Sequence, residues 1–314
     1  MAWNLRRWRR RAMFLSLRTL LRVIGFRHAR TLGSWLGNLQ FWLAWQQRRR
    51  LQREVAQVLG RAADDKSVAV LLREAYRVNN GALVEIMSMF DQRQSESELA
   101  ARCELEGLEH LRAAMTEGRG AIVLATHMGN ASLAMVRLAQ EGWPVSLLYR
   151  KARMMSTGFF QSGLEQYGIQ AILANGGIRA YGQMLAALKQ GRVLFLMMDQ
   201  GLRKAENGVM QRFLGKDVPM PAGPAQLARV SRSPVLPMVA MAASPVWRFA
   251  IQPPVTIGQG SLEADVDFLT RLTEAQVLQH PELWSWHHRR WSQLPMASAP
   301  ARASSDQSLH TDDR

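Results

Sequence analysis

The hydrophobic positions in the first third of the chain recur at helical spacing. Apolar side chains every three or four residues predict helices at residues 51–59, 68–76 and 83–90, and another helix is expected at residues 106–117. A polar linker at residues 91–97 separates the last two helices. The pattern therefore predicts a helical segment ahead of residue 118.

From residue 121 onward, short apolar runs rich in β-branched residues alternate with helical stretches. Strands are expected at residues 121–126, 144–149, 169–173, 193–198, 235–239 and 248–251. Helices are expected at residues 132–138, 158–167, 179–189 and 273–288, the last interrupted near Pro281. This alternation predicts right-handed crossovers, and so an α/β fold with a parallel-rich sheet flanked by helices.

The N-terminal 50 residues have a different composition. The first 60 residues hold thirteen arginines, no lysine and one acid, so they carry +12 of the net charge of +15. The arginines are interleaved with Trp3, Trp8, Trp35, Trp42 and Trp45. The apolar stretches at residues 12–26 and 31–45 are too short to span a bilayer, which needs about 20 apolar residues. Tryptophan, leucine and arginine in this mixture indicate helices that lie in a membrane interface.

Three interpretations of this arm remain open. The composition favours association with an anionic membrane surface, whereas nucleic-acid binding is disfavoured because no recognisable nucleic-acid module follows. The third interpretation is an amphipathic helix folded onto the core. We expect a membrane-associating arm at residues 1–50, an α/β domain at residues 51–295 and a disordered tail at residues 296–314. The lone Cys103 excludes an intramolecular disulfide and indicates folding in a reducing compartment.

The candidate chemistry begins with a histidine at a strand end. Ligands of open α/β sheets bind at the carboxyl ends of the strands, and His127 directly follows the strand predicted at residues 121–126. Gly129 permits a tight turn, and Asn130 suits the N-cap of the next helix. A helix N-terminus disfavours the imidazolium, and a neutral imidazole is what a general base requires. The alternative is a hydrogen-bonded structural histidine.

Other strand ends add charged groups to the same edge of the sheet. Arg150, Lys151 and Arg153 follow the strand expected at residues 144–149, and Asp199 and Gln200 follow the one at residues 193–198. An acid after a fully buried strand is unusual unless it is paired or functional. This edge therefore combines a candidate base, a cation and an acid. The alternative is an Arg–Asp ion pair that closes the sheet. Neither a metal nor a cofactor is expected.

Several short motifs occur together in a specific order. They are Ala-Thr-His-Met-Gly-Asn-Ala-Ser at residues 125–132, Leu-Tyr-Arg at 148–150, Gly-Gly-Ile-Arg at 176–179, Leu-Phe-Leu-Met-Met-Asp-Gln at 194–200, Arg-Phe-Leu-Gly at 212–215, Met-Pro-Ala-Gly-Pro-Ala at 220–225 and His-Pro-Glu-Leu-Trp-Ser-Trp-His-His-Arg-Arg-Trp at 280–291. The ordered set resembles the late acyltransferases of lipid A biosynthesis, the lauroyl/myristoyl acyltransferase family of the lysophospholipid acyltransferase superfamily. The resemblance covers roughly residues 10–292.

The resemblance implies transfer of a fatty acyl chain from acyl carrier protein or acyl-CoA to a hydroxyl or amine of a lipid A-like glycolipid. It implies the cytoplasmic face of a bacterial inner membrane as the location. His127 matches the histidine that deprotonates the acceptor, and the matching substrate-binding positions are Gly129, Asn130, Arg150, Arg179 and Gln200. The alternatives are a different acceptor, such as an aminolipid or a pigment head group, or a catalytically weak relative that binds lipid or carrier.

One position departs from the family's pattern. The family has Glu or Asp five positions after the histidine, where this chain has Ser132. That acid orients the histidine and stabilises its protonated form, and a serine has no charge with which to do so. Three explanations remain: a weakened dyad, a substitute acid for which Asp199 is the candidate, or a catalytically poor relative.

Overall fold

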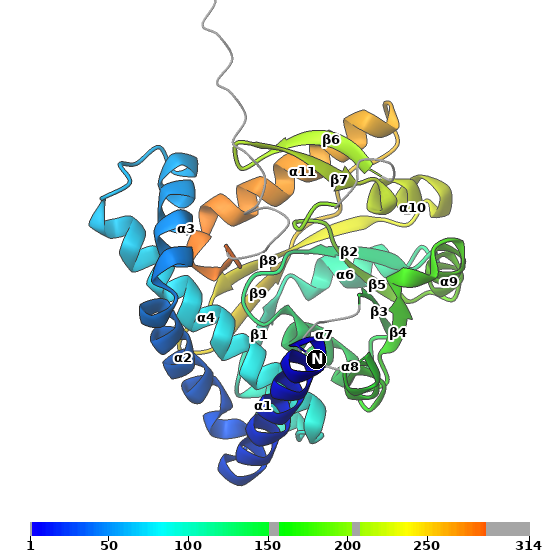
Figure 1. Cartoon of the computed structure of the whole chain (residues 1–314). Coiled ribbons are helices and arrows are strands. Elements are labelled where there is room, and N and C mark those ends of the chain that lie inside the picture. Colours follow the sequence, from blue (N-terminus) through cyan, green and yellow to red (C-terminus); the bar gives the residue numbers. More distant parts are fainter. Residues whose placement is uncertain (1, 151–156, 203–207, 287–314) are drawn as a thin grey trace, which may run out of the picture.

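A computed structural model describes residues 2–150, 157–202 and 208–286, and a central sheet dominates this part of the chain (Figure 1). Its strand order is β1-β9-β8-β2-β5-β3-β4, and all neighbours pair in parallel except β8 and β9. The strands are β1 (Cys103–Glu106), β2 (Ala121–Ala125), β3 (Val145–Tyr149), β4 (Gln170–Leu173), β5 (Val193–Met197), β8 (Val235–Ala242) and β9 (Trp247–Ile251). The expected α/β fold with a parallel-rich sheet is confirmed.

The middle of the sheet is built from the continuous apolar runs. All five residues of β2 are buried because the strand lies between β5 and β8 and is covered on both faces. Sequence analysis missed β1, which has a single neighbour at the edge of the sheet, and the separate antiparallel hairpin of β6 (Gly208–Phe213) and β7 (Lys216–Pro221). β1 and β6 are short or half-exposed strands without a buried apolar run. β7 buries Val218, Pro219 and Met220, but prolines within it disfavour the prediction of a strand.

Helices cover both faces of the sheet. They are α5 (Glu96–Ala100), α6 (Leu108–Met115), α7 (Ala131–Gln140), α8 (Thr157–Glu165), α9 (Ile178–Lys189), α10 (Gly223–Ser231) and α11 (Leu262–Gln279), with short 3-10 turns η1 (Ala174–Gly176) and η3 (Pro281–Leu283). Helices α7 and α8 connect strands in one direction along the sheet, whereas α9 and α10 connect them in the other. Right-handed crossovers therefore place the two pairs on opposite faces, and α9 and α10 contact each other.

The predicted start of the last helix is wrong. The last helix was expected at residues 273–288, but α11 begins at Leu262, where Ser261 caps it by accepting a hydrogen bond from the backbone of Ala264, and it ends at Gln279. The stretches at residues 68–76 and 83–90 are helical as expected, and both belong to one helix, α4 (Lys66–Asp91). The tail expected at residues 296–314 lies outside the described residues.

The N-terminal helices pack closely on the core. They are α1 (Ala2–Ile24), α2 (Phe26–Leu43) and α3 (Trp45–Val58), so the expected boundary at residue 50 falls inside α3. Helix α2 lies against α4, and a Cβ atom on Gly33 or Gly37 would come within 2.4 or 2.3 Å of a backbone carbonyl of α4. One face of α2 is thus folded onto the core, while Trp35, Leu39, Trp42 and Leu43 remain exposed on the other.

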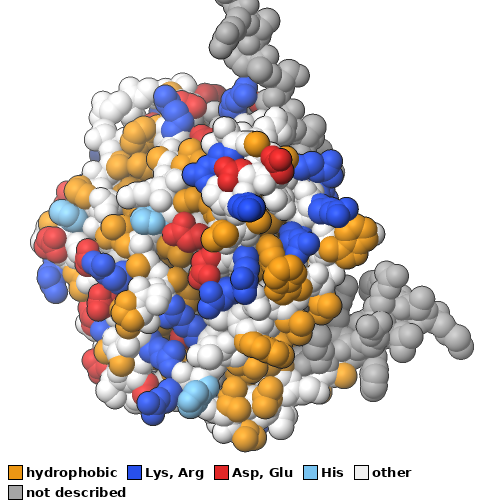
Figure 2. Space-filling model, turned by 90° about the vertical axis from the view of Figure 1, so that its left-hand side faces the viewer, with side chains coloured by type: hydrophobic (Ala, Val, Ile, Leu, Met, Phe, Trp, Pro, Cys, Tyr) orange, Lys and Arg blue, Asp and Glu red, His pale blue; other side chains and the backbone are white. Residues whose placement is uncertain are grey.

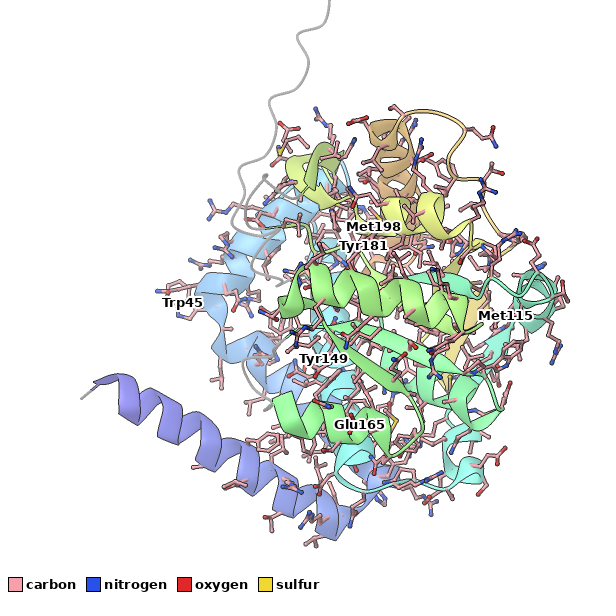
Figure 3. The ribbon with its side chains drawn as sticks, turned by 90° about the vertical axis from the view of Figure 1, so that its right-hand side faces the viewer. Trp45, Met115, Tyr149, Glu165, Tyr181 and Met198 are labelled. Carbon is pink, nitrogen blue, oxygen red and sulfur yellow. The ribbon has the colours of Figure 1, made fainter. Side chains whose placement is uncertain are left out.

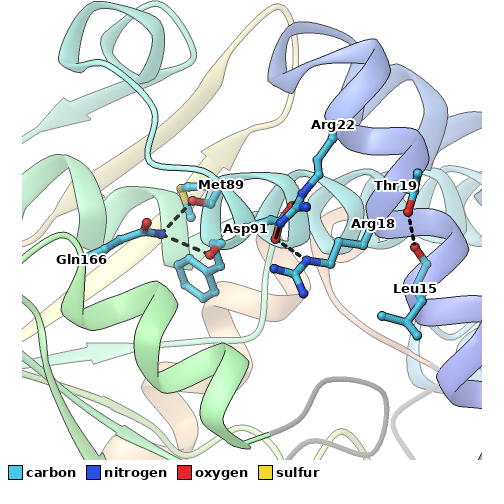
Figure 4. A network of polar contacts seen from close by, with 8 residues as sticks. Leu15, Arg18, Thr19, Arg22, Met89, Asp91 and Gln166 are labelled. Atoms are coloured by element: carbon cyan, nitrogen blue, oxygen red, sulfur yellow. Dashed lines mark hydrogen bonds and ion pairs between the residues drawn. The ribbon is translucent and has the colours of Figure 1, made fainter.

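Ion pairs hold helix α1 against α4 (Figure 4). Arg18 and Arg22 both donate to the carboxylate of Asp91, the last residue of α4, with Arg22 Nε 2.5 Å from Asp91 Oδ2. Burial alone would raise the pKa of Asp91, but these hydrogen bonds and charges outweigh burial and lower it. In the described part of the chain, no helix combines the length and the apolar composition that a membrane span requires.

Candidate active site

The turn after β2 presents His127 at the carboxyl edge of the sheet. Met128 forms an isolated bridge with Trp284, and the backbone N–H of Gly129 donates to the carbonyl of Leu283 at 3.1 Å. Gly129 has φ +56°, and a Cβ atom there would lie 2.8 Å from the ring of Trp247. The backbone around His127 is therefore fixed on both sides, while its side chain remains 39% exposed.

Asp199 follows the neighbouring strand β5 and pairs with His127. The imidazole Nδ1 lies 2.8 Å from Asp199 Oδ1, and the carboxylate is almost completely buried, at 1% exposure. Burial alone would raise the pKa of Asp199, but the charge and hydrogen bond of His127, together with a hydrogen bond from Trp284, outweigh burial and lower it. The ionised carboxylate accepts the Nδ1 proton, so Nε2 is the basic atom of the neutral ring. Asp199 is thus paired with His127, and no arginine among the described residues forms an ion pair with it.

Trp284 completes the surroundings of this carboxylate. Its indole Nε1 donates to Asp199 Oδ2 at 2.9 Å. The ring is fully buried and packs edge-on against Trp286 and Phe213, with centroid separations of 5.0 and 6.0 Å. Both oxygens of Asp199 therefore have a donor, which fixes the plane of the carboxylate and, through it, the plane of the imidazole.

Ser132, at the position of the family's acid, lies in the first turn of α7 and is half-buried. The carboxylate beside the imidazole comes from β5 in this chain. Asp199, the substitute acid of the second explanation for Ser132, lies beside His127, and the three explanations stay predictions.

Asn130 anchors the other end of the turn. Its Oδ1 accepts from the backbone N–H of Leu133 at 3.0 Å, which confirms the expected N-cap of α7. Its Nδ2 donates at 2.9 Å to Glu85 Oε2, a fully buried acid on α4. Both ends of the Asn130 side chain are therefore engaged within the protein.

The remaining candidate residues lie along the same edge. Arg150 follows β3, Gln200 follows Asp199, and Arg179 is the second residue of α9 after β4. Figure 3 shows this side of the molecule, with Tyr149 at the end of β3 and Met198 just after β5. Arg150 and Arg179 are exposed, and β3 lies two strands from β2, or roughly 10 Å. Lys151 and Arg153 lie outside the described residues.

Two buried side chains of this site, Glu85 and Trp284, escaped sequence analysis. Glu85 had a visible signal, because it is an acid inside the apolar stretch of residues 83–90. Trp284 lies in a recognised motif, but nothing in the sequence places its indole on Asp199. In the described residues, no three His, Cys, Asp or Glu side chains come together as a metal site would require.

Comparison with known proteins agrees with the motifs. Residues 3–293 match the family described as bacterial lipid A biosynthesis acyltransferase. The phosphatidylinositol mannoside acyltransferase of Mycolicibacterium smegmatis is 27% identical over 256 residues, covering 77% of this chain and 78% of the relative. The lipid A biosynthesis palmitoleoyltransferase of Escherichia coli K12 is 23% identical over 234 residues, covering 73% and 74%. The chain therefore belongs to the bacterial lipid A biosynthesis acyltransferase family and is an acyltransferase.

Proposed function

We propose that this acyltransferase moves a fatty acyl chain from the thioester of acyl carrier protein, or of acyl-CoA, to a hydroxyl or amine of a lipid A-like glycolipid. The observation that carries this proposal is the pair formed by His127 and Asp199 at the ends of adjacent strands, 2.8 Å apart. A buried carboxylate that holds one imidazole nitrogen while the ring remains accessible is the arrangement of a general base.

The proposed reaction uses both nitrogens of His127. Nε2 takes the proton of the acceptor group as its oxygen or nitrogen attacks the thioester carbonyl. The carbon–sulfur bond then breaks, and the imidazolium returns the proton to the departing thiolate. Asp199 stabilises the positive charge on the ring during these steps, while Trp284 holds the carboxylate in place.

We also propose that the protein works on the cytoplasmic face of a bacterial inner membrane. The outer faces of α2 and α3 expose Trp35, Leu39, Trp42, Leu43 and Trp45. Arginines accompany these rings, with Arg48 and Arg49 lying over Trp42 and Trp45 at 5.4 and 5.2 Å. Exposed tryptophan and leucine beside arginine suit the interface of an anionic bilayer.

The acceptor is the open part of this proposal, because the two relatives differ in what their names say they acylate. One acts on phosphatidylinositol mannoside and the other is a lipid A enzyme. Both acceptors are glycolipids of a membrane, which favours a glycolipid over the aminolipid or pigment head group that the sequence left open. Purified protein in vesicles would be given acyl carrier protein or coenzyme A thioesters together with each glycolipid, and products would be identified by mass spectrometry.

The decisive variant in this assay is His127→Ala. Loss of a general base lowers turnover by about 10²- to 10⁴-fold. His110→Ala, which changes a partly exposed histidine on α6, is the matched control and should leave turnover unchanged. Undiminished transfer by a folded His127→Ala variant would refute the proposed base.

A further inference from the structure

A large groove lies beside the active site and has no part in the chemistry described so far. It has a volume of about 1190 Å³ and runs between α2, α4, α5 and the turn that connects β8 to β9. This exceeds the roughly 300–1,000 Å³ typical of sites for small molecules. Its size alone favours an extended ligand over a single small ion.

The lining of the groove is strongly basic. Two glutamates, Glu74 and Glu98, are outnumbered by five arginines, which are Arg27, Arg30, Arg73, Arg77 and Arg102. Arginine presents a planar set of donors that matches the oxygens of a phosphate. The surplus of positive charge therefore favours an anionic ligand with phosphate-like oxygens.

Two of these arginines are held in place by the protein. Arg30 lies over the ring of Trp247 at 4.4 Å and donates to the carbonyl of Pro245 at 3.3 Å. Arg102 pairs with the buried Glu85 at 3.3 Å and lies over the ring of Phe26. Burial lowers the pKa of Arg30, so an anion in the groove would offset an unfavourable environment.

The mouth of the groove borders the exposed apolar face of α2. Trp35 belongs to both surfaces, because it lines the groove and is 62% exposed. Figure 2 views the molecule from the side of α2, α3 and α4, and shows arginine and lysine side chains next to large hydrophobic ones. Apolar rings beside a basic groove fit a lipid whose headgroup enters the groove while its chains remain in the bilayer.

We propose that this groove binds the phosphodiester headgroup of an anionic membrane phospholipid. The inference rests on the membrane-surface part of the proposed function and adds a specific lipid site to it. A lipid is favoured over an acidic protein surface because the exposed Trp35 lies at the mouth of the groove, where the apolar chains of a lipid would continue into the bilayer.

The groove is also linked to the catalytic turn. Arg102 bonds Glu85, Glu85 accepts from Asn130, and Asn130 caps the helix that follows His127. Trp247, beneath Arg30, donates to Glu85 at 2.6 Å and contacts the site of Gly129. A bound headgroup would therefore lie one layer of side chains from the turn that carries the base.

Binding is tested directly with short-chain phosphatidylglycerol below its micelle concentration, titrated into the full chain and followed by calorimetry. Such a measurement needs neither acyl transfer nor vesicles, so its outcome is independent of the catalytic assignment. Changing two exposed groove arginines together, Arg27→Gln with Arg73→Gln, should weaken binding by about tenfold or more. The matched control, Arg112→Gln with Arg271→Gln, removes two exposed charges from α6 and α11 outside the groove and should change affinity by less than about twofold.

A gain of affinity gives a second, independent readout. Glu98→Gln removes a negative charge from the groove, and glutamine still suits the capping box that Glu98 forms with Ser95. This variant should bind phosphatidylglycerol about threefold more tightly. Short-chain phosphatidylcholine, inorganic phosphate and glycerol 3-phosphate are titrated alongside.

Three results would overturn the proposal. Equal affinity for phosphatidylglycerol in the wild type, the groove variant and the control variant would remove the site. Equal binding of inorganic phosphate would make it a simple anion site. Loss of binding to acyl carrier protein in the groove variant, with lipid binding unchanged, would identify the groove as a docking surface for an acidic protein.

Discussion

Two buried carboxylates lie on either side of the turn that carries His127, and they differ in their charged partner. Asp199 accepts from His127 and from the indole of Trp284, whereas Glu85 accepts from Asn130, Trp247 and Arg102. Each acid thus has a tryptophan donor. The partner of Asp199 can gain and lose a proton, while the arginine beside Glu85 keeps its charge.

This difference separates a reacting carboxylate from a supporting one. An acid paired with an accessible histidine can stabilise a charge that appears during turnover. An acid paired with arginine and asparagine inside the core can only hold the backbone in place. The comparison predicts that removing charge from Asp199 mainly affects catalysis, and that removing charge from Glu85 affects both the stability of the fold and the position of His127.

The largest effect is expected for Asp199→Asn. Loss of the acid in a triad-type site lowers turnover on the order of 10⁴-fold, because asparagine cannot stabilise the imidazolium and favours the wrong tautomer. Steady-state kinetics with circular dichroism as a folding check measure this. Asp217→Asn, on the exposed side of β7, should retain full turnover. A folded Asp199→Asn variant with near-normal kcat would remove Asp199 from the reaction.

Asp199→Asn should also change how the free energy of unfolding depends on pH. Because the folded pKa of Asp199 is lowered, its ionised form adds stability that is fully present above the pKa of the unfolded chain and is lost as the pH falls through the folded value. The gap in unfolding free energy between wild type and Asp199→Asn should therefore narrow below about pH 4. Denaturant unfolding across the acidic range measures it, and a gap that widens on acidification would contradict the lowered pKa.

Glu85→Gln should have the next largest effect on activity and a clear effect on stability. The N–H donors of the glutamine amide would face groups that are themselves donors to Glu85. The change also leaves Arg102 without its charge partner, and we expect a loss of about 3 kcal/mol of unfolding free energy. A small shift of His127 would lower kcat by about 100-fold. The shape of the pH–rate profile should stay that of the wild type, because Glu85 does not contact the imidazole. Glu104→Gln, an exposed acid on β1, is the control.

Trp284→Phe tests the tryptophan beside Asp199 and should have a smaller effect. Phenylalanine keeps the apolar packing but loses one hydrogen bond to the carboxylate, and we expect turnover to fall about tenfold. Trp286→Phe is a close control, because its indole donates to the carbonyl of Pro281 and not to Asp199. Equal losses in both variants would indicate packing and not the bond to Asp199.

Local patterns predicted much of this arrangement, and tertiary contacts explain what they missed. The runs of β2 and β5 are buried throughout most of their length, so both strands and their end residues, His127 and Asp199, were visible in the sequence. Edge strand β1 lacks such a run. Glu85 and Trp284 reach the site from 42 residues before and 157 residues after His127, so only the folded chain brings them together.

The smallest effect is expected for Ser132→Glu, which restores the family's acid at its usual position. With Asp199 already bonded to Nδ1 of His127, a second carboxylate has no vacant role at that nitrogen, and its charge would be repelled by Asp199. Turnover should therefore stay within about threefold of the wild type or fall, and a fall would come from repulsion between the two carboxylates. In Asp199→Asn, the same glutamate should restore part of the lost activity, because it supplies the missing negative charge. Steady-state kinetics on the wild type, both single variants and the double variant measure the coupling between the two positions. A tenfold or larger increase in the turnover of Ser132→Glu alone would mean that His127 lacks a sufficient charge partner in the wild type. Asp199 would then not be the reacting carboxylate that the comparison with Glu85 assumes.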